Sequence, residues 1–139
     1  MESASLKARE LLGSGKYTCV LCSDDVTLTA THRGVRPLLD WLDSGMELKG
    51  FSAADKVVGR ATAFLYCLLG VKDVYAGVIS QPAAQVLKNH EIAFDAGLVV
   101  DGIINRQGTG PCPFETAVLH IDTAPEALEA IRRKMASFQ

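Results

Sequence analysis

The sequence predicts an α/β protein, a three-layer α/β/α sandwich built on a mixed sheet. An apolar run of strand-forming residues, 17–22, is followed after a Ser-Asp-Asp turn by a second such segment, 26–32, as in a β-hairpin. Two further strand-like segments, 72–80 and 97–105, flank a helical segment, as in a strand–helix–strand unit. The chain has 139 residues, of which 48% are hydrophobic and 22% charged, so we expect one domain, 1–139, with a substantial core.

The other segments carry helical patterns. A set of leucines marks a short first helix that ends at a glycine, and Pro37 and Gly45 bracket the second helix. The longest helical segment, 52–69, is apolar on almost every side, so we expect it to be the central buried helix. The expected helices lie within 3–15, 36–45, 52–69, 82–91, 113–121 and 125–138.

Composition narrows the class of protein. The net charge is −2 and the isoelectric point is near 5.9, which does not favour binding to nucleic acid or to an anionic membrane. No apolar run approaches the roughly 18 residues of a membrane-spanning helix, and the N-terminus has no secretory pattern. We therefore expect a cytoplasmic protein, whose four cysteines have no need to form disulfides.

The CVLC segment could supply half of a metal site through Cys19 and Cys22. However, these cysteines lie in a predicted strand, where residues three apart point to opposite faces. No second Cys-x-x-Cys and no His-x-x-x-His accompanies them. Packing of both thiols within a strand is the favoured interpretation, and we expect neither a metal nor a cofactor.

Topology selects the positions at which a site would form. In open α/β sheets, ligands bind at the carboxyl ends of parallel strands, beside the N-termini of the following helices. For this chain that rule selects the start of the predicted central helix (52–56), Ser80 with Gln81, and Asn105 with Arg106. The last pair leads to the segment GTGPCPFE, and we expect all these segments to meet in one crevice.

Cys112 stands between two prolines in that segment. Pro113 suits the first position of a helix, which places Cys112 at the N-cap and Glu115 at the third helical position. There the helix dipole would stabilise a thiolate, with Arg106 adding positive charge. One interpretation is a nucleophilic or ligand-anchoring thiol, with Glu115 orienting it or binding substrate. The other is a capping box, in which Glu115 bonds the backbone N–H of Cys112 and the thiol fills space.

The segment SAADKVVGR allows similar alternatives. Ser52 and Asp55 match a capping box at the start of the predicted central helix. Lys56 would oppose the dipole of that helix, so either it binds an anionic ligand or its side chain extends into water. Gly59 would cost about 1 kcal/mol relative to alanine inside a helix, which indicates that another group packs very closely there.

The segments AADKVVGRATAFL, DVYAGVIS and IINRQGTGPCPFE together resemble a small prokaryotic family known only as a domain of unknown function. The resemblance covers roughly residues 15–121 and implies a cytidine-deaminase-like fold with its pocket. A zinc deaminase carries His-x-Glu at the start of the central helix and Pro-Cys-x-x-Cys at the start of the next. The corresponding segments here, 54–56 and 80–85, supply no zinc ligand, so the resemblance does not imply zinc-dependent deamination.

Two functional hypotheses follow. The first is a metal-independent hydrolase or transferase that binds a nucleoside, a nucleotide or a similar small molecule. In it, Cys112 is the nucleophile, Asp55 and Glu115 serve in acid–base chemistry or hydrogen bonding, and the substrate-binding residues are Lys56, Ser80, Asn105 and Arg106. The second is a non-catalytic metabolite-binding or sensor domain that uses the same residues. Both expect a small-molecule partner with acidic groups, and both leave a homo-oligomer open.

Overall fold

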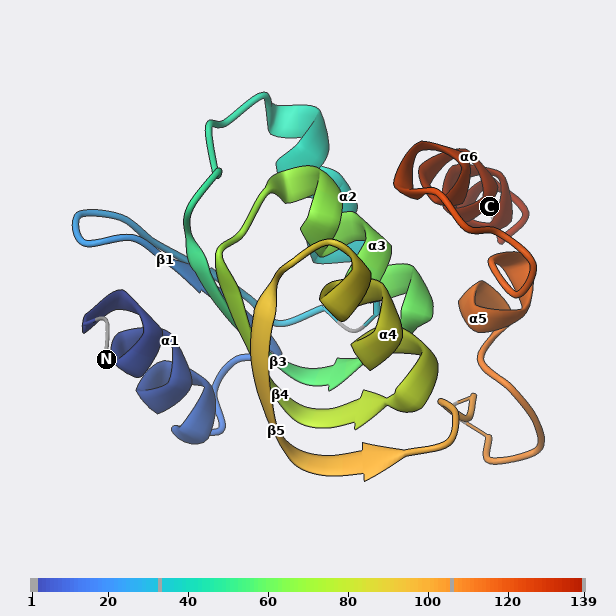
Figure 1. The fold of residues 1–139 in the computed structure, drawn as a ribbon, viewed down its shortest axis with the longest axis horizontal. Helices are drawn as coiled ribbons and strands as arrows, with labels where there is room; N and C mark the ends of the chain where they lie inside the picture. The colour runs from blue at the N-terminus through green and yellow to red at the C-terminus, as the bar shows by residue number, and fades with distance from the viewer. Residues whose placement is uncertain (1–2, 33, 106, 139) are drawn as a thin grey trace.

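The sheet has five strands in the order β2-β1-β3-β4-β5 (Figure 1). The structure, a computed structural model, describes residues 3–32, 34–105 and 107–138. The strands are β1 (Cys19–Cys22), β2 (Thr27–Ala30), β3 (Ser52–Val58), β4 (Asp73–Ser80) and β5 (Ala93–Val100). Strand β1 runs antiparallel to both β2 and β3, whereas β3, β4 and β5 are parallel. The predicted α/β class and mixed sheet are therefore confirmed.

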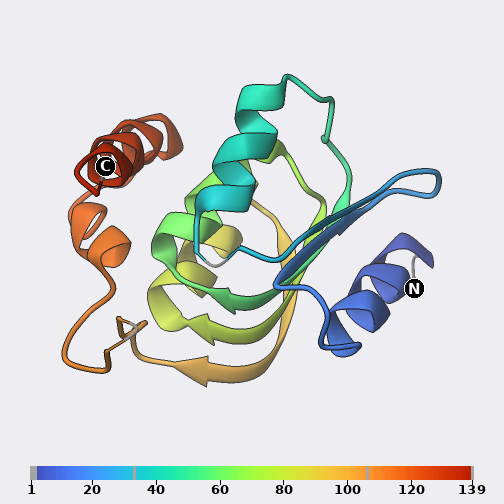
Figure 2. The ribbon, with the colours of Figure 1, turned by 180° about the vertical axis from the view of Figure 1, so that it is seen from behind.

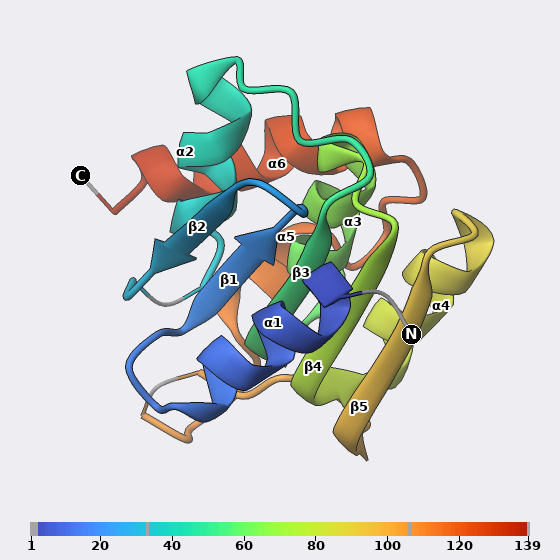
Figure 3. The same ribbon diagram turned by 90° about the vertical axis from the view of Figure 1, so that its left-hand side faces the viewer.

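Helices cover the two faces of the sheet unequally. The helices are α1 (Ser3–Gly13), α2 (Arg36–Ser44), α3 (Arg60–Leu69), α4 (Gln81–Asn89), α5 (Pro113–Ala117) and α6 (Ala124–Ala136). Figure 3 shows α1 lying across one face, over β1, β3 and β4, while the other helices lie behind the sheet. Helix α3 is central on that second side and contacts α2, α4 and α6. Helices α1 and α6 lie at opposite ends of the molecule (Figure 2).

The core is divided by the sheet in the same unequal way. A large apolar cluster lies between the sheet and the helices α2 to α6, with Phe64 and Leu65 of α3 almost fully buried in it. A smaller cluster lies under α1 and includes Ala8, Val20 and Ala54. None of the helices in the described ranges is long and apolar enough to cross a membrane.

The prediction of one long helix over 52–69 was wrong in its first half. Residues Ser52–Val58 form β3, and helix α3 begins only at Arg60, after Gly59 in an extended conformation (φ −95°, ψ 179°). Strand β3 is paired on both sides and, except at Lys56 and Val57, covered on both faces, so its sequence shows no polar alternation. A short apolar run of this kind cannot be distinguished from a buried helix by periodicity. The second half of the prediction is confirmed, because α3 is central and largely buried.

The boundaries of two further elements differ from the expectation. Strand β5 starts at Ala93 rather than at residue 97 and ends at Val100, and it directly follows a turn in which Glu91 adopts a positive φ of 59°. Helix α5 ends at Ala117 instead of residue 121. The hairpin and the helices α1, α2, α4 and α6 lie where the sequence predicted them.

The three parallel strands are curved (Figure 1). Lys56, Gly77 and Gly97 lie in one row across them, between the paired rows Asp55–Ala76–Ala96 and Val57–Val78–Leu98. A Cβ atom on Gly77 would lie 2.8 Å from the carbonyl oxygen of Lys56, and one on Gly97 would lie 2.9 Å from that of Gly77. Both glycines are therefore required by the neighbouring backbone. In β3 the alternation also shifts at this row, so that Val58 enters the large core and Val57 is 44% exposed.

Candidate functional site

The carboxyl ends of β3 and β4 lead directly into α3 and α4, as the topology rule requires of a site. The N-cap of helix α3 is Gly59, which has no side chain to cap the helix. The carboxylate of Glu115 supplies the cap, because it accepts hydrogen bonds from the backbone N–H groups of Arg60 (2.6 Å) and Ala61 (2.9 Å). A Cβ atom on Gly59 would lie 2.6–2.8 Å from the carboxyl group of Glu115, which confirms the close packing predicted at this glycine.

Arg60 extends the same connection towards the C-terminal segment. Its guanidinium donates to the carbonyl oxygens of Val118 (3.2 Å) and Ile121, and it lies 3.5 Å from the carboxylate of Asp122. We call the contacts of residues 59–61 with residues 115–122 the α3–α5 clamp. It joins parts of the chain about 55 residues apart and fixes the position of α5 against α3.

Cys112 is the N-cap of α5, with Pro113 following it, as predicted. The capping-box interpretation of this segment was wrong, because Glu115 bonds to α3 and the backbone N–H of Cys112 donates instead to the carbonyl of Ile103 (2.9 Å). The thiol of Cys112 is free and half-buried. Among the predicted site residues, Glu115 is the nearest to Cys112 along the chain, but its carboxylate is bonded to the start of α3.

Other predicted site residues at this edge also have local partners. Ser80 is fully buried and caps α4, its hydroxyl accepting from the N–H of Ala83 (3.1 Å). The side chain of Asn105 closes its own loop through the N–H (3.0 Å) and the hydroxyl (3.1 Å) of Thr109. Arg106, predicted to bind substrate, lies outside the described residues. Ser80 and Asn105 therefore help to shape this edge.

Asp55 lies in β3 and not at a helix start, so the capping box predicted for Ser52 and Asp55 was wrong. The Asp55 carboxylate is buried on the α3 side of the sheet, where it accepts hydrogen bonds from the hydroxyl of Tyr66 (2.7 Å) and the N–H of Val57 (3.4 Å). The sulfur of Cys19 lies 3.0 Å from the same hydroxyl. We call Cys19, Asp55 and Tyr66 the Asp55 cluster.

Burial dominates the protonation of this cluster. It raises the pKa of Asp55 to about 6, although the hydrogen bond from Tyr66 opposes the rise. It also raises the pKa values of Cys19 and Tyr66 well above their ordinary range. Cys22 packs in the small core on the other face of β1, so the two cysteines point to opposite faces, as predicted. Within the described part of the chain, no group of three His, Cys, Asp or Glu side chains could hold a metal.

Lys56 follows Asp55 directly but lies on the other face of the sheet, beside α1. It lines a hollow together with Arg9, Leu12, Gly13, Tyr75 and Gly77, which we call the Lys56 groove. The side chain of Lys56 is exposed, and its ammonium has no hydrogen-bond or ion-pair partner among the described residues. Because Lys56 belongs to a strand, the expectation that it opposes a helix dipole was wrong.

The sequence did not predict two residues of the Lys56 groove, Arg9 and Tyr75. The guanidinium of Arg9 lies 4.1 Å from the centre of the Tyr75 ring and donates to the carboxylate of Asp95 (3.2 Å). Arg9 is in α1, Tyr75 in β4 and Asp95 in β5, so only the fold brings the three together. No motif signals them, because each fits the ordinary pattern of its own element.

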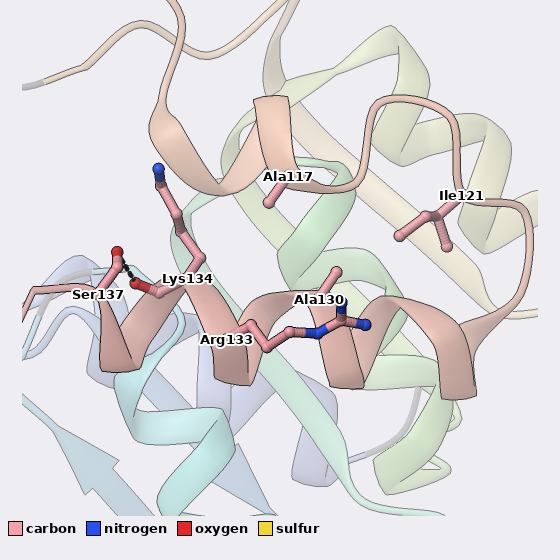
Figure 4. A pocket seen from close by; sticks show the side chains of 6 residues that line it. All are labelled: Ala117, Ile121, Ala130, Arg133, Lys134 and Ser137. Atoms are coloured by element: carbon pink, nitrogen blue, oxygen red, sulfur yellow. Dashed lines mark hydrogen bonds between the residues drawn. The ribbon is translucent and has the colours of Figure 1, made fainter.

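A second hollow lies between α5 and α6 (Figure 4). Ala117 and Ala130 line it from the two helices, and Arg133 and Lys134 stand at its rim. Arg133 is already paired with Glu129 (3.1 Å) at the surface. Among the described residues that line this hollow, none has a buried polar side chain and none is a predicted site residue, so the Lys56 groove is the stronger candidate.

These features define an α/β domain in which four predicted site residues, Asp55, Ser80, Asn105 and Glu115, have hydrogen-bond partners within the fold, and in which a cationic groove is open on the α1 face. The chain belongs to the family described as domain of unknown function DUF1893 (TM1506), which matches residues 7–135. A crystal structure of a DUF1893 family protein, TM1506 from Thermotoga maritima, is 23% identical with a TM-score of 0.85, over 99% of this chain and 92% of that one. The predicted family is therefore confirmed, and the likeness supports the fold alone.

A second solved structure is similar only in part. It is a diaminohydroxyphosphoribosylaminopyrimidine deaminase/5-amino-6-(5-phosphoribosylamino)uracil reductase from Thermotoga maritima, 16% identical with a TM-score of 0.42. The similarity covers 68% of this chain and 35% of that protein, and no activity follows from it. Comparison with curated proteins finds no match.

Removing the Glu115 carboxylate should destabilise the fold. In Glu115→Ala the two N–H groups at the start of α3 lose their acceptor, and we expect the free energy of unfolding to fall by about 1–3 kcal/mol. Glu115→Gln keeps one acceptor oxygen and should lose less. Urea denaturation measures both, with Glu47→Ala, at an exposed glutamate, as the control. Equal effects of Glu115→Ala and Glu47→Ala would contradict the clamp.

Asp55 should make stability depend on pH. Its folded-state pKa of about 6 lies above the ordinary 3.8, so its proton stabilises the folded state fully below pH 3.8, and this contribution is lost as pH rises through 6. A difference of about two units corresponds to about 3 kcal/mol. Asp55→Asn cannot ionise, so it should gain stability relative to the wild type between pH 4 and pH 8.

Urea denaturation across that pH range measures the gain, with Asp40→Asn at an exposed carboxylate as the control. A difference between wild type and Asp55→Asn that stays constant with pH would show that Asp55 titrates alike in both states.

Alkylation should distinguish the four thiols. Cys19 and Cys22 are buried, and burial raises the pKa of the half-buried Cys67 to about 12, which leaves little thiolate at neutral pH. We therefore expect iodoacetamide to modify Cys112 first, as followed by mass spectrometry of peptides. Cys112→Ser should leave the fold intact by circular dichroism. Equal alkylation rates at Cys112 and Cys67 would contradict this expectation, because the thiol at the N-terminus of α5 would then be no more reactive than the thiol of Cys67.

Proposed function

We propose that this domain binds a small anionic molecule of nucleoside or nucleotide size in the Lys56 groove and does not transform it. The observation that carries the proposal is the exposed ammonium of Lys56, which has no partner among the described residues and stands in a hollow. An acidic group on a ligand would supply the missing partner.

The walls of the groove suit the rest of such a ligand. Leu12 and the ring of Tyr75 offer apolar surface, and Gly13 and Gly77 leave the backbone uncovered by side chains. Small-molecule sites commonly combine apolar walls with a few polar groups that orient the ligand. An apolar or planar body could lie against these walls while its acidic group faces Lys56.

Binding without catalysis is favoured by the state of the other predicted residues. An enzyme built on Cys112 would need Asp55 and Glu115 in the same site. The Asp55 carboxylate is bonded to Tyr66 in the core, and the Glu115 carboxylate is bonded to the start of α3. The thiol of Cys112 is then left without the acid–base groups that the enzymatic hypothesis assigned to it.

Loss of the Lys56 ammonium should weaken this binding. We expect nucleoside 5′-monophosphates to raise the Tm of the wild type more than the neutral nucleosides do, because ligand binding to the folded state stabilises it. In Lys56→Ala the Kd measured by calorimetry should rise at least about tenfold, which corresponds to 1.4 kcal/mol. Lys7→Ala, at an exposed lysine of α1, is the matched control and should bind as the wild type does.

Chromatography of the ligand after prolonged incubation should recover it unchanged. If the wild type converted any of these nucleosides or nucleotides and Cys112→Ser did not, the enzymatic hypothesis would be restored. Equal affinity of wild type and Lys56→Ala would remove the groove as the site.

A further inference from the structure

We propose that Arg9 is the second cation of the Lys56 groove, and that the acidic group it binds together with Lys56 is a phosphate monoester. This inference rests on the proposed function and names its ligand class. The groove presents two cations from two elements, Arg9 from α1 and Lys56 from β3. A phosphate monoester carries up to two negative charges and three acceptor oxygens, so it can use both cations at once.

The guanidinium of Arg9 is oriented and has donors to spare. It stacks on Tyr75 at 4.1 Å and gives one hydrogen bond, from Nη1 to Oδ2 of Asp95 (3.2 Å). A guanidinium carries five N–H donors, and Asp95 is the acceptor that the described residues provide. The remaining donors are free for a ligand, and their planar fork matches the oxygens of a phosphate better than an ammonium does.

The local backbone explains why a single cation would bind an anion only weakly here. Leu12 and Gly13 line the groove at the C-terminal end of α1, where the helix dipole is negative and disfavours an anion. The N–H groups of Ser14 and Gly15 bond the carbonyls of Glu10, Leu11 and Leu12, which reduces this effect. Two cations would offset what remains and would favour a dianionic phosphate over a carboxylate.

Asp95 is a positioning residue in this arrangement. Its second oxygen, Oδ1, accepts from the N–H of Ala96 (2.9 Å), which holds the carboxylate close to the strand. The carboxylate in turn holds Arg9 across β4, over the ring of Tyr75. Both side chains are largely solvent-exposed, at 47% for Arg9 and 71% for Asp95, so the contribution of this ion pair to stability is small and its loss should leave the fold intact.

Calorimetry with ribose 5-phosphate, inorganic phosphate and acetate tests the inference. The wild type should bind the two phosphates and bind acetate at least about tenfold more weakly. Arg9→Ala should weaken phosphate binding about tenfold, and Arg9→Lys should recover part of the loss. Asp95→Asn should weaken binding about threefold, but should have no further effect when added to Arg9→Ala, because Asp95 acts through Arg9. Arg132→Ala, which removes an arginine of a distant surface ion pair with Asp43, is the control.

The outcomes separate the two proposals. If Lys56→Ala loses phosphate binding while Arg9→Ala keeps it, the second cation is disproved and the groove stands. If both variants keep it, the proposed function fails as well. Equal affinity for acetate and phosphate would overturn the ligand class. Tighter binding in Asp95→Asn would show that Asp95 competes with the ligand for Arg9, which would overturn its positioning role.

Discussion

One carboxylate determines how the last part of the chain joins the rest. The Glu115 carboxylate accepts hydrogen bonds from the N–H groups of Arg60 and Ala61. The guanidinium of Arg60 in turn donates to the carbonyls of Val118 and Ile121, which follow α5. Because α3 is the helix around which α2, α4 and α6 pack, the C-terminal segment is fixed to the core both by the contacts at the N-terminus of α3 and by the packing of α6. The helix cannot cap itself, since its N-cap is Gly59, and a larger residue there would collide with the carboxylate.

The α3–α5 clamp also changes what the family motifs mean. Two motifs in the segments that carry the family resemblance are D-K-x-x-G (residues 55–59) and C-P-x-E (residues 112–115). Gly59 of the first and Glu115 of the second are far apart in sequence but meet in the structure. As a pair they are explained by packing and capping, without any chemistry. Asp55 is likewise explained by its hydrogen bond to Tyr66. Lys56 is the residue of these motifs whose side chain the described structure leaves exposed and unpaired, and this is why the ligand site is sought beside it.

More of the fold than of the candidate site could be predicted from the sequence. Turn chemistry and strand-forming residues located the hairpin, and the alternation within β1 predicted that Cys19 and Cys22 point to opposite faces. The segment 52–58 was misassigned because a strand covered on both faces has no polar side to reveal its period. That one error placed Asp55 and Lys56 in the same helical turn, whereas a strand sends neighbouring side chains to opposite faces. The approach of Arg9 to Tyr75 was out of reach, because it depends on how α1 crosses the sheet.

The long span of the α3–α5 clamp has a consequence for the order of events during synthesis. Arg60 leaves the ribosome 55 residues before Glu115, which takes about 3 to 11 seconds at the usual rates of translation. During this interval the first residues of α3 have been synthesised, but the carboxylate that accepts hydrogen bonds from their N–H groups has not. The native cap of α3 therefore cannot form until the segment that carries Glu115 has been synthesised.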